Sequence, residues 1–498
     1  MLQKHHPVRV RFAPSPTGFV HVGSLLTVLF NWLLARQHDG TFILRIEDTD
    51  QHRLVPGAVE NILKVLAWVG LNPDEGVVLD SQGQINQIGA DGPYIQSQRL
   101  DLYRQYVDQL LESGHAYHCF CSPERLEKLR QNQTERKLPP MYDKYCLSLS
   151  PEAVAEKLTN LRAGDHHVIR LKVPPDGSTV FEDLIRGRVE TPHHSVDDCV
   201  LLKSDGFPTY HLAVVVDDHL MAITHVIRGQ EWLASAPKHV LLYQAFGWTP
   251  PLFAHLSHLL NTDRSKLSKR QGDVAVEEYM TRGYLPEALL NFLAITAWNE
   301  GEGSEQEIYS LKELVKKFSL ERVHKTGAVF DLDKLNWLNG MYLRQMDIAE
   351  LTKRVTPYLT RAGYDTTDTV YLKKIVALEQ ERIKTLAELP AMVDYFFTDT
   401  LEYQTELLMW KKSDRRQTKN NLEQLVLYLS AMASWDEKKL EEGIMTWIAE
   451  QQLTNGEVLW PMRVALSGQD KSPGPFAIAA VIGKTRTLER LRHAAAKL

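Results

Sequence analysis

A short loop between a predicted strand and a predicted helix constrains the fold of this chain most strongly. The stretch Val8–Phe12 alternates apolar and charged residues, which is typical of a strand. After residue 24, apolar residues recur at helical spacing as far as Gly40. The loop between them contains two prolines and two glycines, which stiffen a turn and let backbone approach a ligand closely. Because a helix start presents free N–H groups and a positive dipole end, the loop predicts an anion site, and phosphate is the usual anion. A surface turn with a solvated His21 is the alternative that this stretch alone leaves open.

Length and composition limit the class of protein. At 498 residues the chain is too long for one core and should form about three or four domains. No apolar run approaches the ~18 residues that a membrane span requires, so we expect no membrane association. The first residues lack the apolar region of a signal peptide, and four cysteines make no disulfide framework, so we expect a cytoplasmic protein. A net charge of −6 argues against nonspecific polyanion binding by the whole surface but allows a local basic track.

Residues 1–96 predict alternating strands and helices. Strands are expected at Val8–Phe12 and Thr41–Ile46, and helices from Gly23 and over Gly57–Val69. That order favours a parallel, doubly wound sheet. The polar, glycine-rich residues 76–96 predict a loop.

Residues 97–210 change in pattern and predict an inserted α/β module. A helix over Arg99–Ser113 precedes short strands, which are expected at Val168–Val173, Val180–Leu184 and Cys199–Leu202. The first sheet is then expected to resume with strands at Tyr210–Val216 and Ala222–Arg228.

From about residue 250 onward the pattern is helical. Apolar residues recur at a spacing of about 3.6 over Pro286–Ala297, Leu311–Lys317, Leu332–Asn339, Ile348–Ala362, Tyr371–Leu389, Leu422–Met432 and Asp436–Gln451. The fold class is therefore multidomain, with an α/β part followed by an all-α part.

Several motifs occur together and in order along the chain. His21-Val22-Gly23-Ser24 and Lys266-Leu267-Ser268-Lys269-Arg270 resemble the HIGH and KMSKS signatures of class I aminoacyl-tRNA synthetases. A narrower resemblance, to bacterial-type glutamyl-tRNA synthetase, covers the chain from about residue 8 to its end. It rests on Arg11–Gly23, Arg45–Asp50, Thr209–His211, Val215–His219, Val226–Arg228, Leu241–Gly247 and Arg463–Gly468.

The resemblance implies a domain organisation. A Rossmann-type parallel catalytic sheet would occupy residues 1–96 and 211–260, split by an inserted acceptor-end-binding module at 97–210. Residues 261–346 would hold the KMSKS-like loop and contact the tRNA stem. Residues 347–498 would form helical anticodon-binding domains, as two sub-bundles with a break near 395–420.

The resemblance also implies a reaction. L-Glutamate would be activated with ATP, as its Mg²⁺ complex, to glutamyl-adenylate and transferred to the 3′-terminal adenosine of tRNA(Glu), with release of pyrophosphate and AMP. Fixed positive charge is what such charged transition states require, so the implied catalytic residues are His21, Lys266 and Lys269. The implied ATP-binding residues are His21, Gly23, Ser24, Lys266, Ser268 and Lys269.

Glutamate must be held by its charges, and the planar guanidinium of arginine suits a carboxylate. The implied glutamate-binding residues are Arg11, Ala13, Ser15, Glu47, Tyr210 and Arg228. Arg228 would take the side-chain carboxylate, and Glu47 would meet the α-ammonium group. A neutral amide would leave the guanidinium unpaired, which explains rejection of glutamine.

Three cysteines, Cys119, Cys121 and Cys146, are spaced as in a zinc site of some family members. A structural zinc site needs four ligands, and Ser148 occupies the position where the fourth would fall. The sequence therefore favours three reduced structural cysteines over zinc.

The resemblance names tRNA(Glu) as the partner of a monomeric enzyme. Lys/Arg clusters at 411–416 and 471–497 suit contacts with a nucleic-acid backbone. Arg382 aligns with the residue that the family uses to discriminate the third anticodon base, which points to a discriminating enzyme. Misacylation of tRNA(Gln) stays open.

Other functions explain less of the chain. A glutaminyl-tRNA synthetase shares the motifs but has a β-barrel C-terminal part, and the short relative that glutamylates a tRNA nucleoside lacks the anticodon-binding half. A nucleotidyltransferase without tRNA would leave the helices after residue 270 unexplained. A non-catalytic paralogue should have lost His21, Lys269 or Arg228, and all three are present.

Overall fold

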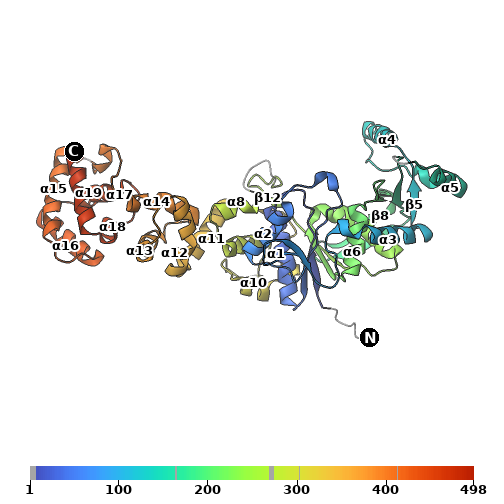
Figure 1. The fold of residues 1–498 in the computed structure, drawn as a ribbon, viewed down its shortest axis with the longest axis horizontal. Helices are drawn as coiled ribbons and strands as arrows, with labels where there is room; N and C mark the ends of the chain where they lie inside the picture. Colours follow the sequence, from blue (N-terminus) through green and yellow to red (C-terminus); the bar gives the residue numbers. More distant parts are fainter. Residues whose placement is uncertain (1–6, 163–164, 268–273, 302, 412) are drawn as a thin grey trace. The chain divides into compact units, whose positions relative to one another are not determined.

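The computed structural model describes residues 7–162, 165–267, 274–301, 303–411 and 413–498 (Figure 1). The chain divides into two compact units. The first comprises Met1–Tyr279 and Leu289–Asp331, and the second comprises Met280–Ala288 and Leu332–Leu498. No helix among the described residues is long and apolar enough to cross a membrane.

The first unit begins with a four-stranded sheet in the order β1-β2-β3-β4. β1 (Arg9–Phe12) runs parallel to β2 (Thr41–Leu44), β2 runs parallel to β3 (Glu75–Leu79), and β4 (Ile85–Ile88) returns antiparallel. The helix α1 (Val22–Gln37) follows β1, and α2 (Ala58–Val69) follows β2. The predicted alternation of strands and helices is confirmed.

The prediction of a loop over residues 76–96 is wrong, because β3 and β4 form a hairpin there. Gly76 on β3 serves close packing. At Gly76, where φ is +117°, a Cβ atom would lie 2.1 Å from the carbonyl oxygen of Leu44 on β2. Only glycine permits that approach, so a residue that usually marks a turn here marks a contact between strands.

A second sheet has the order β10-β11-β7-β8. β10 (His225–Gly229) and β11 (Leu252–Leu256) are parallel, whereas β7 (Ser178–Asp183) and β8 (Gly187–Pro192) form an antiparallel hairpin. The sheet lies beside β1, since the amide of Thr224 donates to the carbonyl of Arg9 over 2.9 Å. The strand predicted at Ala222–Arg228 is thus confirmed as β10, and β7 confirms the strand at Val180–Leu184.

The strand predicted at Tyr210–Val216 is wrong, because these residues begin the helix α6 (Tyr210–Leu220). All residues from Leu212 to Asp218 are buried, so no polar face interrupts the apolar run. Periodicity cannot separate a helix buried on all sides from a buried strand, and three consecutive valines favoured the strand. The helix α7 (Ala236–Ala245) follows β10.

A three-stranded antiparallel sheet lies within residues 97–210. It is built from β5 (Ala116–Cys119), β6 (Val168–Leu171) and β9 (Val200–Leu202), in that order. Three helices accompany it in Figure 1, namely α3 (Leu100–Glu112), α4 (Pro123–Glu135) and α5 (Pro151–Thr159). Ser122 and Ser150 cap α4 and α5 by accepting a backbone N–H, which satisfies one free donor of each helix start.

The first unit also contains a short parallel pair, β12 (Leu259–Leu260) with β13 (Ala328–Val329), and the helix α10 (Leu311–Lys317). The helices α8 (Val276–Thr281) and α9 (Pro286–Ala297) follow residue 275. The predicted helices at Pro286–Ala297 and Leu311–Lys317 are confirmed.

The described part of the second unit is helical after residue 331 (Figure 1). Its helices are α11 (Leu332–Gln345), α12 (Ile348–Arg361), α13 (Thr369–Glu379), α14 (Leu389–Phe397), α15 (Arg415–Ala431), α16 (Glu437–Glu450), α17 (Asn455–Ser467), α18 (Pro475–Ile482) and α19 (Lys484–Lys497). One predicted helix, Tyr371–Leu389, is too long, because α13 ends at Glu379 and α14 begins only at Leu389. A class with a mostly parallel sheet followed by helices is confirmed.

Candidate active site

The predicted anion site is a real pocket of about 360 Å³ at the start of α1. His21 has an extended backbone, and its Nδ1 accepts the amide N–H of Gly23 over 2.9 Å, so it caps the helix. The residues that line the pocket are His21, Gly23, Ser24, Leu26, Thr27, Gly229, Glu231, Leu256, Ser257, His258, Leu259, Lys266 and Leu267. The predicted ATP-binding residues His21, Gly23, Ser24 and Lys266 therefore lie around one space.

The segment after the KMSKS-like motif is tied to this helix start. The amide of Val22 donates to the carbonyl of Val274 over 3.0 Å, and the amide of Val276 donates to the carbonyl of Val20 over 3.0 Å. Lys266 precedes the motif's remaining residues and is exposed at the pocket. Ser268 and Lys269 lie outside the described residues.

A second pocket, of about 380 Å³, contains the whole predicted glutamate-binding set. Its lining includes Arg11, Ala13, Ser15, Glu47, Tyr210 and Arg228. Arg11 and Arg228 sit near the last residues of β1 and β10, and Glu47 lies just after β2. Ligands commonly bind at the carboxyl ends of strands in open α/β sheets.

The two pockets adjoin, because they share the lining residues Ser24, Thr27, Gly229 and Glu231. Ser24 and Thr27 come from the first turns of α1, and Gly229 ends β10. At Gly229 a Cβ atom would lie 2.3 Å from a carboxylate oxygen of Glu231. The first pocket presents a helix start and a lysine. The second presents three arginines, Arg11, Arg53 and Arg228, and two glutamates, Glu47 and Glu231.

A buried network of ion pairs holds the wall of the second pocket. The Nε of Arg11 donates to Asp218 over 3.1 Å, and Arg45 bridges Asp218 and Glu47, at 2.9 Å to each. Burial opposes ionisation of Asp218, yet Arg11 and Arg45 hold its pKa below the usual value. For Glu47 burial prevails over Arg45 and Arg11, and its pKa is raised.

Asp217 anchors a separate part of the same network. Its carboxylate accepts hydrogen bonds from Arg99, Gln96 and Tyr103, each over 2.8 Å. The side chain of Asp217 is fully buried. Asp217 and Asp218 therefore bind arginines of this chain, and both are structural supports of the site.

The environment of Arg228 contains residues that the motifs did not indicate. Its Nε donates to Nε2 of His255 over 3.0 Å, and its Nη1 donates to the hydroxyl of Tyr210 over 3.0 Å. Nη1 also lies 3.2 Å from Nδ1 of His239. His255 comes from β11 and His239 from α7, so only the folded chain brings them to Arg228.

The histidines near Arg228 are held in their neutral forms. Burial, and next the charge of Arg228, lower the pKa of His239 well below its usual value. Burial, with Lys238 and Arg228, lowers the pKa of His211 to about 4, and His211 lies 3.2 Å from His239. Neutral imidazoles accept hydrogen bonds from Arg228 without cancelling its charge.

Known proteins resemble this chain over its full length. Residues 7–337 match the family described as tRNA synthetases class I (E and Q), catalytic domain. Residues 350–495 match an anticodon binding domain. The glutamate–tRNA ligase of Clostridioides difficile is 45% identical, over 98% of each chain. This chain belongs to the glutamate–tRNA ligase family. The resemblance to glutamyl-tRNA synthetase is thereby confirmed.

Further relatives agree with that family. The glutamate–tRNA ligase of Pelodictyon phaeoclathratiforme is 46% identical, over 97% of each chain. A crystal structure of a glutamate tRNA ligase from Elizabethkingia meningosepticum in complex with its amino acid is 35% identical. It covers 99% of this chain and 100% of its own, with a TM-score of 0.88. The fold class of a class I synthetase with a helical anticodon region is confirmed.

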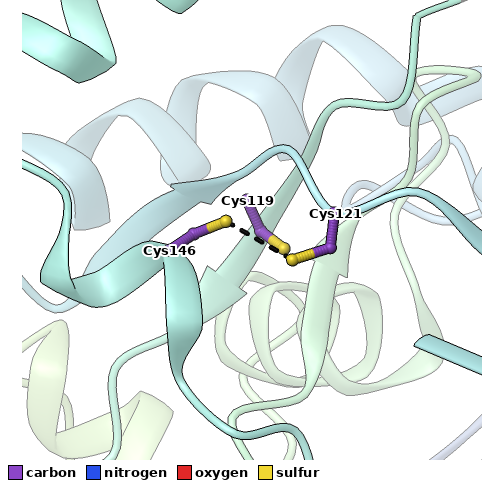
Figure 2. Close-up of side chains that lie close together, drawn as sticks. All are labelled: Cys119, Cys121 and Cys146. Carbon is purple, nitrogen blue, oxygen red and sulfur yellow. Dashed lines mark hydrogen bonds between the residues drawn. The ribbon is translucent and has the colours of Figure 1, made fainter. Parts of the chain in front are cut away.

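The three cysteines form a cluster, shown in Figure 2, and none of them lines either of the two pockets. Their sulfur atoms all lie within 4.8 Å of one another. The hydroxyl of Tyr142 lies 3.4 Å from Sγ of Cys119 and 3.3 Å from Sγ of Cys121. The phenol oxygen of Tyr142, four residues before Cys146, therefore lies beside the thiols.

Arg382 lies in the second unit, beyond the end of α13. Its Nη1 pairs with the buried carboxylate of Glu379 over 2.6 Å, and its Nη2 donates to the carbonyl of Lys471 over 3.0 Å. Burial raises the pKa of Glu379 to about 7, against the effect of Arg382. Arg382 is therefore held in one direction and remains partly exposed.

Proposed function

We propose that this chain activates L-glutamate with ATP and transfers the glutamyl group to the 3′-terminal adenosine of tRNA(Glu). The two adjoining pockets carry the proposal, because one is built for an amino acid with charged ends and the other for a polyphosphate. Their common wall would bring the α-carboxylate of glutamate to the α-phosphate of ATP. Such proximity supplies much of the rate enhancement in a reaction between two bound substrates.

In the second pocket each charge of glutamate has a counterpart. Arg228 would bind the side-chain carboxylate, since its hydrogen-bond partners in the protein are neutral. Glu47 would bind the α-ammonium group, and Arg11 would face the α-carboxylate. Ser15, Ala13 and Tyr210 would complete the contact surface.

In the first pocket the start of α1 and Lys266 would bind the phosphates of ATP. Backbone N–H groups at the start of a helix donate to phosphate oxygens, and a lysine stabilises charge that develops during transfer. His21, Gly23 and Ser24 line this end of the pocket. Ser268 and Lys269 would act with them, and Mg²⁺ would accompany ATP as part of the substrate.

Charging assays test the proposal directly. Purified protein is incubated with ATP, labelled glutamate or glutamine, and either tRNA(Glu) or tRNA(Gln). We expect labelled tRNA with glutamate and tRNA(Glu), and no charging with glutamine. Charging with glutamine alone would overturn the assignment. We also expect ATP–pyrophosphate exchange to require bound tRNA.

The tRNA would contact several regions in turn. The module at 97–210 would hold the acceptor end, residues 261–346 would contact the stem, and the helices of 347–498 would bind the anticodon. Arg382 is the proposed discriminator of the third anticodon base, and its fixed geometry supports that role. The same assay with tRNA(Gln) distinguishes a discriminating enzyme from one that misacylates.

A monomeric state and a cytoplasmic location remain predictions from the sequence.

The cysteine cluster has the donor set of a structural zinc site. Three thiolates and the phenol oxygen of Tyr142 would give the four ligands that zinc requires. Bound zinc would cross-link β5 to the segment around Cys146 and supply no step of the reaction. Three reduced cysteines are the alternative, and metal analysis separates the two.

A further inference from the structure

The hydrogen bond from Arg228 to His255 continues to a third residue, Asp183. The Nδ1 of His255 lies 2.6 Å from a carboxylate oxygen, Oδ2, of Asp183, and both side chains are fully buried. The three residues come from β10, β11 and β7, which are neighbours in one sheet. Asp183, His255 and Arg228 thus form a chain of contacts that ends at the second pocket.

The carboxylate of Asp183 has a fixed orientation. Its other oxygen, Oδ1, accepts the backbone amides of Ile185 and Arg186, over 3.0 and 2.8 Å, in the turn between β7 and β8. Oδ2 is therefore the oxygen that faces His255. Because a carboxylate only accepts, Nδ1 of His255 must carry a proton, and its Nε2 must offer a lone pair to Arg228.

The protonation states agree with this arrangement. Burial opposes ionisation of Asp183, but His255 and the backbone amides lower its pKa. Burial lowers the pKa of His255 and outweighs the opposing effect of Asp183. The pair is thus a carboxylate and a neutral imidazole.

In the part of the chain that the structure describes, Arg228 makes no direct contact with a carboxylate. Among the described residues, no carboxylate oxygen lies within 4.0 Å of the Arg228 guanidinium nitrogens, whereas Arg11 and Arg45 both have such a partner. The nearest negative charge along this chain of hydrogen bonds is the carboxylate of Asp183, and the imidazole ring of His255 separates it from Arg228. It can offset part of the cost of burying Arg228 without filling the place of a substrate carboxylate.

We propose that Asp183 and His255 are positioning residues for Arg228, which fix its direction and leave its charge available to the side-chain carboxylate of the amino acid. This inference rests on the proposed function, because it assigns the specificity of the same pocket. The selectivity for glutamate over glutamine then depends on two residues that do not line the pocket. Loss of the His255 acceptor would free Arg228 to turn or to seek another partner.

Two substitutions of His255 test its two hydrogen bonds separately, namely the one that it donates to Asp183 and the one that it accepts from Arg228. His255→Gln keeps an acceptor near the position of Nε2, facing Arg228, and loses the donor to Asp183. His255→Asn keeps a donor near the position of Nδ1, facing Asp183, and loses the acceptor for Arg228. We expect His255→Asn to raise the KM for glutamate about tenfold or more, as for one lost charge-assisted hydrogen bond. His255→Gln should raise it clearly less, and the KM for ATP should stay near wild type in both.

Asp183→Asn tests the hydrogen bond between Asp183 and His255. The amide oxygen would keep the place of Oδ1, so the NH₂ group would face Nδ1 of His255 and force the other tautomer. An N–H at Nε2 would then point at the N–H of Arg228, and we expect a higher KM for glutamate with reduced rejection of glutamine. His193→Gln is the control, because His193 contacts Thr179 and Asp176 near the same hairpin and does not touch Arg228.

The outcomes are distinct. Equal glutamate KM values for His255→Asn, Asp183→Asn and wild type would overturn the inference. So would equal rises in the KM for glutamate and for ATP in His255→Asn and His255→Gln, since that pattern indicates a general structural effect. A wild-type protein that charges no tRNA with glutamate would instead overturn the proposed function.

Discussion

Glu47 and Arg45 form a buried ion pair at the wall of the second pocket, with Oε1 of Glu47 2.9 Å from Nη2 of Arg45. Arg45 also pairs with Asp218, so its charge is divided between two carboxylates. Burial raises the pKa of Glu47 in spite of Arg45. A second cation at Glu47 would therefore be favourable, which is what the α-ammonium group of an amino acid supplies.

The first prediction concerns that cation. Glu47→Gln should raise the KM for glutamate by more than about tenfold, because the ammonium group loses a charged partner. The KM for ATP should change little. Asp48→Asn, at the next residue and outside the lining of the pocket, is the control. A wild-type KM for glutamate in Glu47→Gln would contradict the assigned role.

The second prediction concerns specificity. Arg228→Ala should raise the KM for glutamate by well over about tenfold, because a charge-assisted hydrogen bond and the matching charge both disappear. Discrimination against glutamine should fall as well, because the variant lacks the guanidinium that the side-chain amide of glutamine would leave unpaired. Steady-state charging with both amino acids measures the two effects. An unchanged ratio of kcat/KM values would rule out Arg228 as the determinant.

The third prediction concerns the phosphate site. Lys266→Ala should slow tRNA-dependent ATP–pyrophosphate exchange by about 100-fold, the usual effect of removing one group that stabilises transition-state charge. The KM for glutamate should stay near wild type, because Lys266 does not line the second pocket. Lys64→Ala, an exposed lysine of α2, serves as the matched control. Near-normal exchange in Lys266→Ala would show that Lys266 does not act on the phosphates.

The fourth prediction concerns pH and stability. His211 has a pKa of about 4 in the folded chain and about 6.5 when unfolded. The contribution of neutral His211 to the free energy of unfolding is therefore complete above pH 6.5. It declines as the pH falls towards 4, by at most about 3 kcal/mol. His211→Gln lacks this titration, so the Tm difference between wild type and variant should shift against wild type from pH 7 to pH 5. A constant difference would mean that His211 does not titrate in this way.

The fifth prediction concerns metal. Protein purified without chelator should contain about one zinc per chain. Cys121→Ser should lose it, and Tyr142→Phe should bind it more weakly. Cys199→Ala should keep it, because the fourth cysteine lies outside the cluster. Zinc-free wild-type protein would leave three reduced structural cysteines as the explanation.

Sequence motifs predicted the pocket residues that come from contiguous segments. His21, Gly23 and Ser24 follow one another along the chain, so the local strand–loop–helix pattern placed them together. Arg228 and Glu47 were predicted as pocket residues because the sequence motifs around them resemble those of one family. Each lines the pocket in which the resemblance placed it.

The sequence could not indicate residues that only the folded sheet brings together. Asp183, His255 and His239 come from separate elements, and none of them belongs to a local motif. Tyr142 could not be indicated by the sequence, because tyrosine is not among the usual zinc ligands and only the fold brings its hydroxyl to the thiols. The helix at Tyr210–Val216 was missed because complete burial removes the polar face that reveals helical periodicity.

The wall shared by the two pockets has a consequence for inhibitors. One compound with a group for each pocket would cross Ser24, Thr27, Gly229 and Glu231 and occupy both spaces at once. Once its first group is bound, the second meets its pocket at a high effective concentration, so the affinity of the whole can far exceed that of either part. Resistance by substitution at this wall would be costly to the enzyme, because a change there would alter both pockets at once.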